Sequence, residues 1–214
     1  GAELTGIAST ENIITNTNAT FLQNINVGVA ITAGKLGIGF TDANVKVGNT
    51  ALDSLTTGNY NTAVGHQSLT ANTTGTNNTA VGNESLDANT TGQNNVAIGA
   101  ASLGVNSTGS SNTAVGTQSL DANTTGADNT AIGKGALTSN TTASFNTAVG
   151  NDALRDVTTN TNNVAMGVNA ALTSTGSYNT AIGNNTFRGT SNSGSNCTAL
   201  GYNALNANTT GAQN

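Results

Sequence analysis

The sequence predicts an all-β protein, a parallel β-solenoid (β-roll) of about ten 17-residue coils, and three observations lead to this prediction. The stretch "NTAVGHQSLTANTTGTNNTAVGNESLDANTTG", residues 61–92, contains nearly the same unit twice. Each unit is too short for the two helices that a helical solenoid needs in every repeat. Only 7% of the 214 residues are charged and 3% aromatic, whereas aliphatic residues recur at fixed intervals, which is typical of neither an enzyme domain nor a disordered chain.

The repeat unit starts at the Asn of "NTAVG", which we number position one of seventeen. It begins at Asn44 and returns every 17 residues as far as Asn163. The next unit, at Asn179, comes after 16 residues, and the unit at Cys197 comes after a further 18. Asn214 opens one more unit, which predicts that the chain is a piece of a longer fibre.

Two columns of bulky aliphatic residues are expected to form the core. Position four is Val, Ile, Met or Leu in every unit, and position nine is almost always Leu, with Leu172 expected there in the unit at Asn163. Stacked coils pair by parallel β hydrogen bonds about 4.8 Å apart, so that equivalent residues form ladders. The predicted core ladder comprises Val64, Val81, Ile98, Val115, Ile132, Leu69, Leu86, Leu103, Leu120 and Leu137.

Position three is Ala in every unit but the first, where Lys46 stands. Because side chains alternate between the two faces of a strand, this column is expected opposite the aliphatic residues of position four. A uniform column of small side chains indicates close packing against another chain, which predicts a homo-oligomer. The predicted contacts between chains are Ala63, Ala80, Ala97, Ala114, Ala131 and Ala148.

The two parts of the chain are residues 1–43, which lack the repeat, and the solenoid domain, residues 44–214. "FLQNINVGVAITAGKLGIGFTDANVKVG" reads as strands broken by Gly and predicts a β-rich cap or connector over the open edge of the first coil. No signal segment, apolar span or heptad repeat is present, so any anchor or secretion signal is expected outside these residues.

No catalytic constellation is visible, and we expect a protein that is not an enzyme and binds no cofactor. Two residues were weighed for chemistry. His66, the single His, sits at a variable position, and Cys197, the single Cys, replaces the Asn of position one. Neither has partners in sequence for a metal site or an intrachain disulfide, so Cys197 is expected as a buried free thiol.

The acidic residues predict a solvated face that keeps the solenoid soluble. Asp53, Asp87 and Asp121 share position ten and recur two coils apart, about 9.6 Å, which is too far for one cation to bridge within a chain. A calcium site involving these acids and Glu84 or Asp128 remains the alternative. The net charge of −5 argues against nucleic acid or anionic membrane as the partner.

Three aromatic residues, Tyr60, Phe145 and Tyr178, occupy the last position of their units. An exposed aromatic ring on a polar surface is suited to stacking on a sugar ring. Packing of a turn over the edge of a coil is the other interpretation.

The units "NTAVG", "NVAIG" and "NTAIG", each followed by a Ser/Ala-Leu pair, resemble the YadA-like heads of trimeric autotransporter adhesins. They are also similar to Asn-Thr-Gly-rich repeats of phage tail fibres and of mosaic adhesive trimer proteins. "GKLGIGFTD", residues 34–42, resembles the lead-in before such repeats in tail fibres. The resemblance covers residues 44–213, although the adhesin repeat is usually shorter than 17.

The resemblance implies a left-handed β-roll in which three chains surround a common axis. It also implies an extracellular fibre, on a cell surface or a virion, that mediates or presents attachment to a glycan or protein of another cell. The expected partners are therefore two further copies of the chain and such a surface ligand, without membrane insertion by this segment.

Two other functions fit the repeat. Thr-rich β-solenoids bind ice through regular arrays, and "NTTG" supplies Thr73, Thr90, Thr124, Thr141, Thr158 and Thr209 in register. The paired Thr residues are contiguous, however, which directs adjacent hydroxyls to opposite faces. A glycan-binding accessory module is the third hypothesis.

Overall fold

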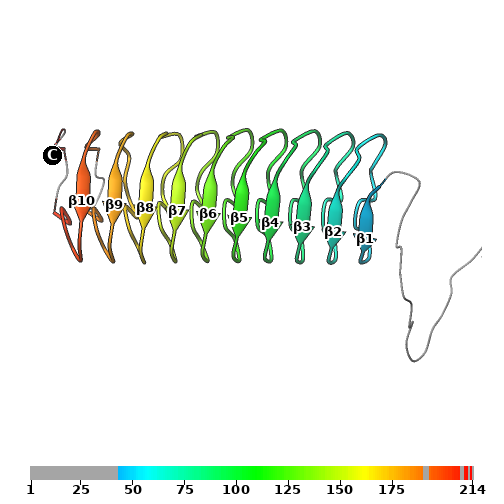
Figure 1. The fold of residues 1–214 in the computed structure, drawn as a ribbon, viewed down its shortest axis with the longest axis horizontal. Helices are drawn as coiled ribbons and strands as arrows, with labels where there is room; N and C mark the ends of the chain where they lie inside the picture. The colour runs from blue at the N-terminus through cyan, green and yellow to red at the C-terminus, as the bar shows by residue number, and fades with distance from the viewer. Residues whose placement is uncertain (1–42, 190–192, 208–209, 212, 214) are drawn as a thin grey trace, which may run out of the picture. The chain divides into compact units, whose positions relative to one another are not determined.

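The chain is a parallel β-solenoid in a computed structural model that describes residues 43–189, 193–207, 210, 211 and 213. Its described part contains ten short strands in one parallel sheet, side by side in chain order (Figure 1). The prediction of ten 17-residue coils is confirmed, whereas the predicted cap at residues 1–43 lies outside the described residues except for Ala43. The strands are β1 (Val45–Val47), β2 (Thr62–Val64), β3 (Thr79–Val81), β4 (Val96–Ile98), β5 (Thr113–Val115), β6 (Thr130–Ile132), β7 (Thr147–Val149), β8 (Val164–Met166), β9 (Thr180–Ile182) and β10 (Thr198–Leu200).

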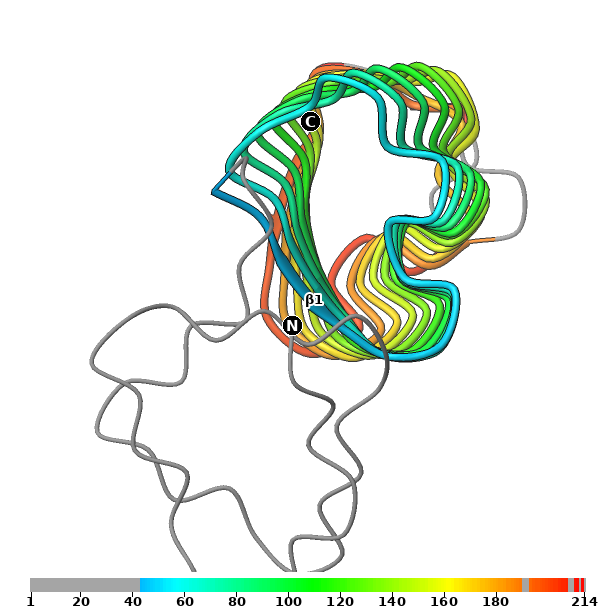
Figure 2. The same ribbon diagram turned by 90° about the vertical axis from the view of Figure 1, so that its right-hand side faces the viewer.

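Every strand pairs with the same positions of the next coil. Val64 of β2 lies beside Val81 of β3, which lies beside Ile98 of β4, and this register continues to β10 in spite of the coils of 16 and 18 residues. The coils therefore superimpose when viewed along the stack (Figure 2). Identical side chains recur at the spacing of parallel strands, about 4.8 Å.

Each coil turns at glycines and at residues in left-handed conformations. The Gly of position five has φ between +113° and +139°, and in Gly99 a Cβ would lie 2.6 Å from the carbonyl carbon of Gly116 in the next coil. Only Gly permits both this φ and this close approach. Positions seven, nine and seventeen also have positive φ, near +55°, even where they carry Leu or an aromatic residue.

The orientation predicted for the strands is wrong. The Ala column faces the interior, where Ala63, Ala80, Ala97, Ala114, Ala131 and Ala148 have no exposed surface, so none of them contacts another chain. The position-four residues expected in the core face outward instead. Ile98 and Ile132 are each 41% exposed, and Val64, Val81 and Val115 are half-buried.

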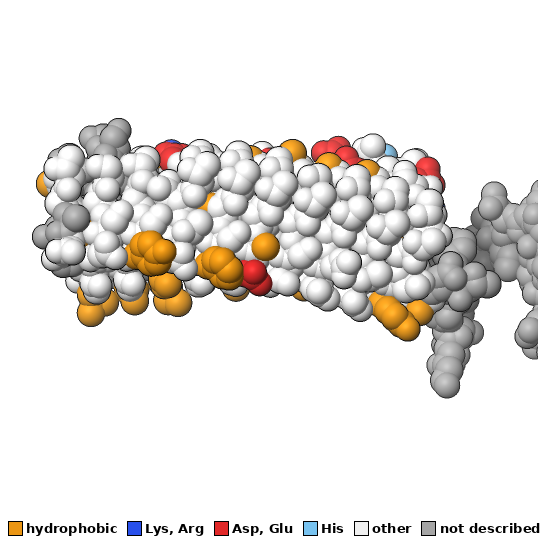
Figure 3. All heavy atoms as spheres, turned by 90° about the horizontal axis from the view of Figure 1, so that it is seen from above, with side chains coloured by type: hydrophobic (Ala, Val, Ile, Leu, Met, Phe, Trp, Pro, Cys, Tyr) orange, Lys and Arg blue, Asp and Glu red, His pale blue; other side chains and the backbone are white. Residues whose placement is uncertain are grey.

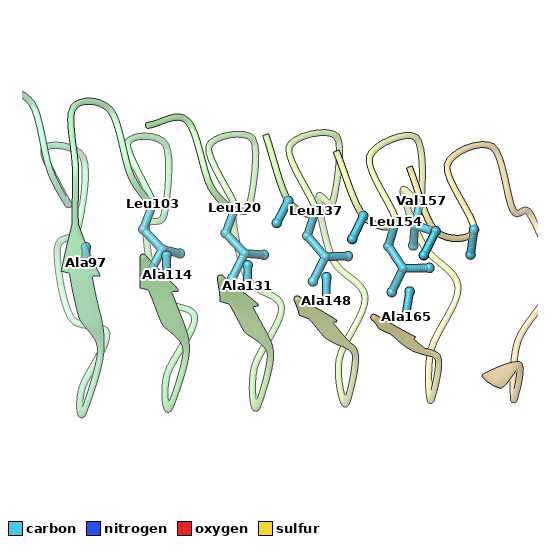
Figure 4. Packing of buried hydrophobic residues seen from close by; sticks show 14 of the residues in the cluster. Ala97, Leu103, Ala114, Leu120, Ala131, Leu137, Ala148, Leu154, Val157 and Ala165 are labelled. Atoms are coloured by element: carbon cyan, nitrogen blue, oxygen red, sulfur yellow. The ribbon is translucent and has the colours of Figure 1, made fainter. Parts of the chain in front are cut away.

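The reversal follows from how little room a coil encloses. The Leu residues at position nine are buried as predicted, and Leu103, Leu120 and Leu137 point toward the Ala column across the interior (Figure 4). Asn side chains fill the space beside them. A second branched residue from each strand would overpack this interior, so the strand turns its smallest side chain inward.

A ladder of Asn side chains at position one joins successive coils. Asn112 accepts a hydrogen bond from the backbone N–H of Asn129 through Oδ1 (3.0 Å) and donates one from Nδ2 to the carbonyl of Gly126 (2.8 Å). The equivalent Asn-to-next-coil bond recurs from Asn44 to Asn179, at 2.8 to 3.0 Å. These buried amides satisfy backbone groups that the three-residue strands leave unpaired.

A second Asn ladder runs along position twelve. The Nδ2 of each of Asn89, Asn106, Asn123 and Asn140 donates to the Oδ1 of the Asn one coil earlier, at 2.8 to 2.9 Å. Val157 takes this position in the next coil and ends the ladder. The Oδ1 of Asn140 is consequently buried without a hydrogen-bond partner.

The 16-residue coil loses its residue after position nine, not before it. Ala171 takes position nine, with φ +49°, and its neighbour Ala170 accepts the hydrogen bond from the N–H of Leu154 that position eight accepts elsewhere. The prediction of Leu172 at position nine is therefore wrong. Leu172 lies at position ten and is 95% buried, so it still contributes apolar contact.

Candidate binding surfaces

The outward face of the sheet is a continuous uncharged surface, which we call the aliphatic face. It comprises the first and third residues of β1 to β10, all of which are Thr, Val, Ile, Met or Leu. In the single chain Val47 and Met166 are each 42% exposed, and Leu200 is 75% exposed. β-branched side chains favour the extended strand, but nothing in the described part of the chain covers this face. Sequence reasoning listed half of these residues and assigned them to the interior.

A second surface is the row of position-seventeen residues, one from each coil, which we call the edge row. Tyr60, Phe145 and Tyr178 lie there with 66%, 60% and 61% of their surface exposed. These values contradict the packing of a turn over the coil edge. Figure 3 shows hydrophobic side chains as small separate groups on a broad surface that otherwise carries few charges.

The Thr residues of "NTTG" form two rows with different environments. At position thirteen the hydroxyls of Thr73 and Thr90 donate to the backbone carbonyl of the next coil, each at 3.0 Å. Thr124 and Thr141 do the same, Thr158 is exposed, and Thr209 lies outside the described residues. The hydroxyls at position thirteen therefore serve the fold, and the exposed Thr side chains of position fourteen form a single row. Ice binding remains a prediction that thermal hysteresis tests.

The acidic residues lie on the side chains' own exposed or half-buried positions. Burial, followed by the nearby charge of Glu84, raises the pKa of Asp121 above its usual value of 3.8. A Cβ on Gly104 would lie 2.8 Å from the Oδ1 of Asp121, so the carboxyl group occupies space that this Gly leaves open. No group of three or more His, Cys, Asp or Glu side chains suited to a metal ion occurs among the described residues.

The two single residues weighed for chemistry have structural surroundings. His66 is exposed, and its Nδ1 lies 3.2 Å from the Oδ1 of Asn83 in the next coil. Cys197 is buried as a free thiol, which confirms that prediction. Its Sγ donates to the carbonyl of Gly211 at 3.2 Å, replacing the donor that Asn supplies at position one of other coils.

Charged side chains of opposite sign meet only locally. Lys46, the exception in the Ala column, pairs with Asp53 at 3.4 Å. Arg155 pairs with Asp156 at 2.8 Å, and this hydrogen bond raises the pKa of the Arg155 guanidinium. Exposed pairs of this kind contribute little to stability. They do not define a binding site.

The fold gives no direct identification of the protein. Over the described residues there is no helix whose length and hydropathy would suit a membrane span. No protein-family model, curated protein or solved structure matches this chain. The likeness to trimeric adhesin heads therefore depends on the repeat residues alone.

Proposed function

We propose that this chain is a structural and adhesive fibre segment, a homotrimeric β-solenoid that mediates or presents attachment to a cell surface. The aliphatic face carries the proposal. Twenty outward residues, two from each of ten strands, include no charged side chain. Monomeric soluble proteins rarely expose a contiguous apolar surface of such length, about 45 Å for ten strands.

A second and third copy of the same chain are the partners that fit this face best. Its side chains form ridges that recur at the coil spacing, and only another coil stack of the same period presents matching grooves along the whole length. Closed symmetric assembly then covers the face of every copy. The number three comes from the resemblance of "NTAVG" and its variants to trimeric adhesin heads.

The extracellular fibre role is supported by features beyond the face. The chain is made of one repeated coil, which builds length and spacing with no chemical centre of its own. A rigid solenoid is suited to holding a ligand-binding surface away from the particle that carries it. The low charge of the sides leaves attachment to contacts with neutral surface molecules.

One pair of variants in a single coil tests the assembly. Ile98→Lys places a charge on the aliphatic face, whereas Ala100→Lys places it at exposed position six, where Lys134 occurs naturally. Sedimentation velocity is expected to show Ile98→Lys dissociating and Ala100→Lys retaining the wild-type mass. Identical sedimentation of both variants and the wild type would contradict the assignment of this face.

A further inference from the structure

We propose that Phe145 and Tyr178 form a stacking platform for a linear, neutral β-1,4-linked polysaccharide that lies parallel to the solenoid axis. This inference rests on the proposed adhesive function and names its ligand class. Both rings belong to the edge row, and they are separated by one coil, which contributes Asn162 at the same position.

Neither folding nor backbone geometry explains aromatic residues at these places. Phe145 and Tyr178 are about 60% exposed and so contribute little to the core. Both have φ of +61°, a left-handed conformation in which Asn and Asp are enriched and bulky residues are disfavoured. The chain itself uses Asn at this position, with nearly the same φ, in the coils that contain Asn77, Asn94, Asn162 and Asn196.

The coil spacing sets the distance between the rings. The backbone N–H of Asn162 donates to the carbonyl of Ser144, and that of Tyr178 donates to the carbonyl of Thr161, so the edge row advances by one coil at each step. Two steps place the aromatic residues about 9 to 10 Å apart along the axis. An extended β-1,4-linked hexose chain advances by nearly one coil spacing per sugar, so that alternate sugars meet the two rings.

The surroundings of the rings supply polar partners without charge. Between them, Asn162 is held by a 2.9 Å hydrogen bond from its Nδ2 to the hydroxyl of Thr161. Ser144 and Ser177, which precede the two aromatic residues, accept backbone hydrogen bonds through Oγ at 3.0 and 3.1 Å and retain their own protons to donate. No Lys or Arg occurs at positions thirteen to seventeen of any coil, which disfavours an anionic polysaccharide.

The form of the platform also limits the ligand. Apolar C–H faces of pyranose rings stack on aromatic faces, and their equatorial hydroxyls meet amides and hydroxyls at the ring edges. Two rings on one straight, exposed row suit an extended polymer, since a single sugar covers only one of them. A helical α-1,4-linked glucan does not keep alternate sugars facing the same side.

The test compares the double variant Phe145→Asn/Tyr178→Asn with wild type by calorimetry, using cellohexaose, chitohexaose and, as a geometric control, maltohexaose. Tyr60→Asn is the matched control variant, because Tyr60 occupies the same position and φ, but Asn94 stands two coils away instead of a second aromatic residue. Asn is native at this position, so all the variants are expected to fold.

Wild type is expected to bind at least one of the two β-linked hexaoses and not maltohexaose. The double variant is expected to lose binding about tenfold or more, and Tyr60→Asn less than about twofold. No binding of either β-linked hexaose, or equal losses in both variants, would overturn the proposal. A fall in particle mass on making the double variant would also overturn it, since the edge row would then be a contact between chains.

The same samples separate this proposal from the proposed function. Wild type with the mass of a trimer but no affinity for either β-linked hexaose would overturn the platform and leave the fibre assembly standing. Binding by a monomeric wild-type protein would overturn the assembly and support the platform.

Discussion

Replacing Asn112 with Ala is expected to destabilise the solenoid by about 2 to 4 kcal/mol. The side chain is fully buried and bonds two coils. Its loss leaves the backbone N–H of Asn129 without its 3.0 Å partner, at a cost of about 1 to 3 kcal/mol for a buried unsatisfied donor. The 2.8 Å bond to Gly126 contributes about 1 kcal/mol more, moderated because this carbonyl also accepts from Asn123.

Urea unfolding followed by circular dichroism measures this effect, with all samples at one protein concentration because assembly couples to stability. Thr125→Ala is the control in the same coil, since Thr125 is exposed and no side-chain hydrogen bond of it is part of the ladders. Asn112→Asp keeps the acceptor for the N–H of Asn129 and loses the donor to Gly126. Unfolding of Asn112→Ala within about 0.5 kcal/mol of wild type would refute the stabilising role of the ladder.

Three further predictions follow from the coil. Gly99→Ala is expected to lower the urea midpoint more than Gly201→Ala, because both have positive φ but only Gly99 has the next coil within 3 Å of an added Cβ; equal losses would contradict this. Ala114→Val is expected to cost about 1 to 3 kcal/mol by overpacking, and Thr113→Val less than about 0.5 kcal/mol, in chemical unfolding; the reverse order would indicate that the strand faces the other way. Burial raises the pKa of Asp121, so the folded chain holds this proton more tightly than the unfolded chain, and its stability falls as pH rises from 3.8 through the raised value. Asp121→Asn is therefore expected to unfold at higher temperature than wild type at neutral pH but not below about pH 3, and an equal gain at both would exclude titration as the cause.

The sequence was sufficient to predict the coil and its period. A 17-residue unit returning with the same Asn, Gly and Leu permits only a stack in which equal residues lie above one another, and the register from β1 to β10 confirms it. Leu at position nine was also predicted correctly as core. Its left-handed backbone was not predicted, since Leu has no preference for that conformation and tertiary packing imposes it.

The inside and outside of the strand were predicted in the wrong phase. Alternation states that Ala97 and Ile98 face opposite sides, but it does not state which side is enclosed. Hydrophobicity favoured Ile98 as the buried residue. The informative signal was that Asn95, Ala97 and Gly99 share one phase and hardly vary, which is expected of side chains in a narrow interior with fixed hydrogen bonds.

The candidate surfaces divide in the same way. The edge aromatics Tyr60, Phe145 and Tyr178 were identified from sequence because their residue type is rare in this chain, and their exposure agrees with a binding role. The aliphatic face was missed because buried and interface residues have the same composition. Only the structure separates the residues that one chain covers from those it leaves for a partner.

The mass of the native particle by multi-angle light scattering tests the proposed assembly most directly. The chain has a mass of 21.0 kDa. Closure of three aliphatic faces around one axis predicts a single species of about three times that mass, unchanged on moderate dilution. A homogeneous particle of one chain's mass would show that this face stays in water, and would contradict the trimeric fibre.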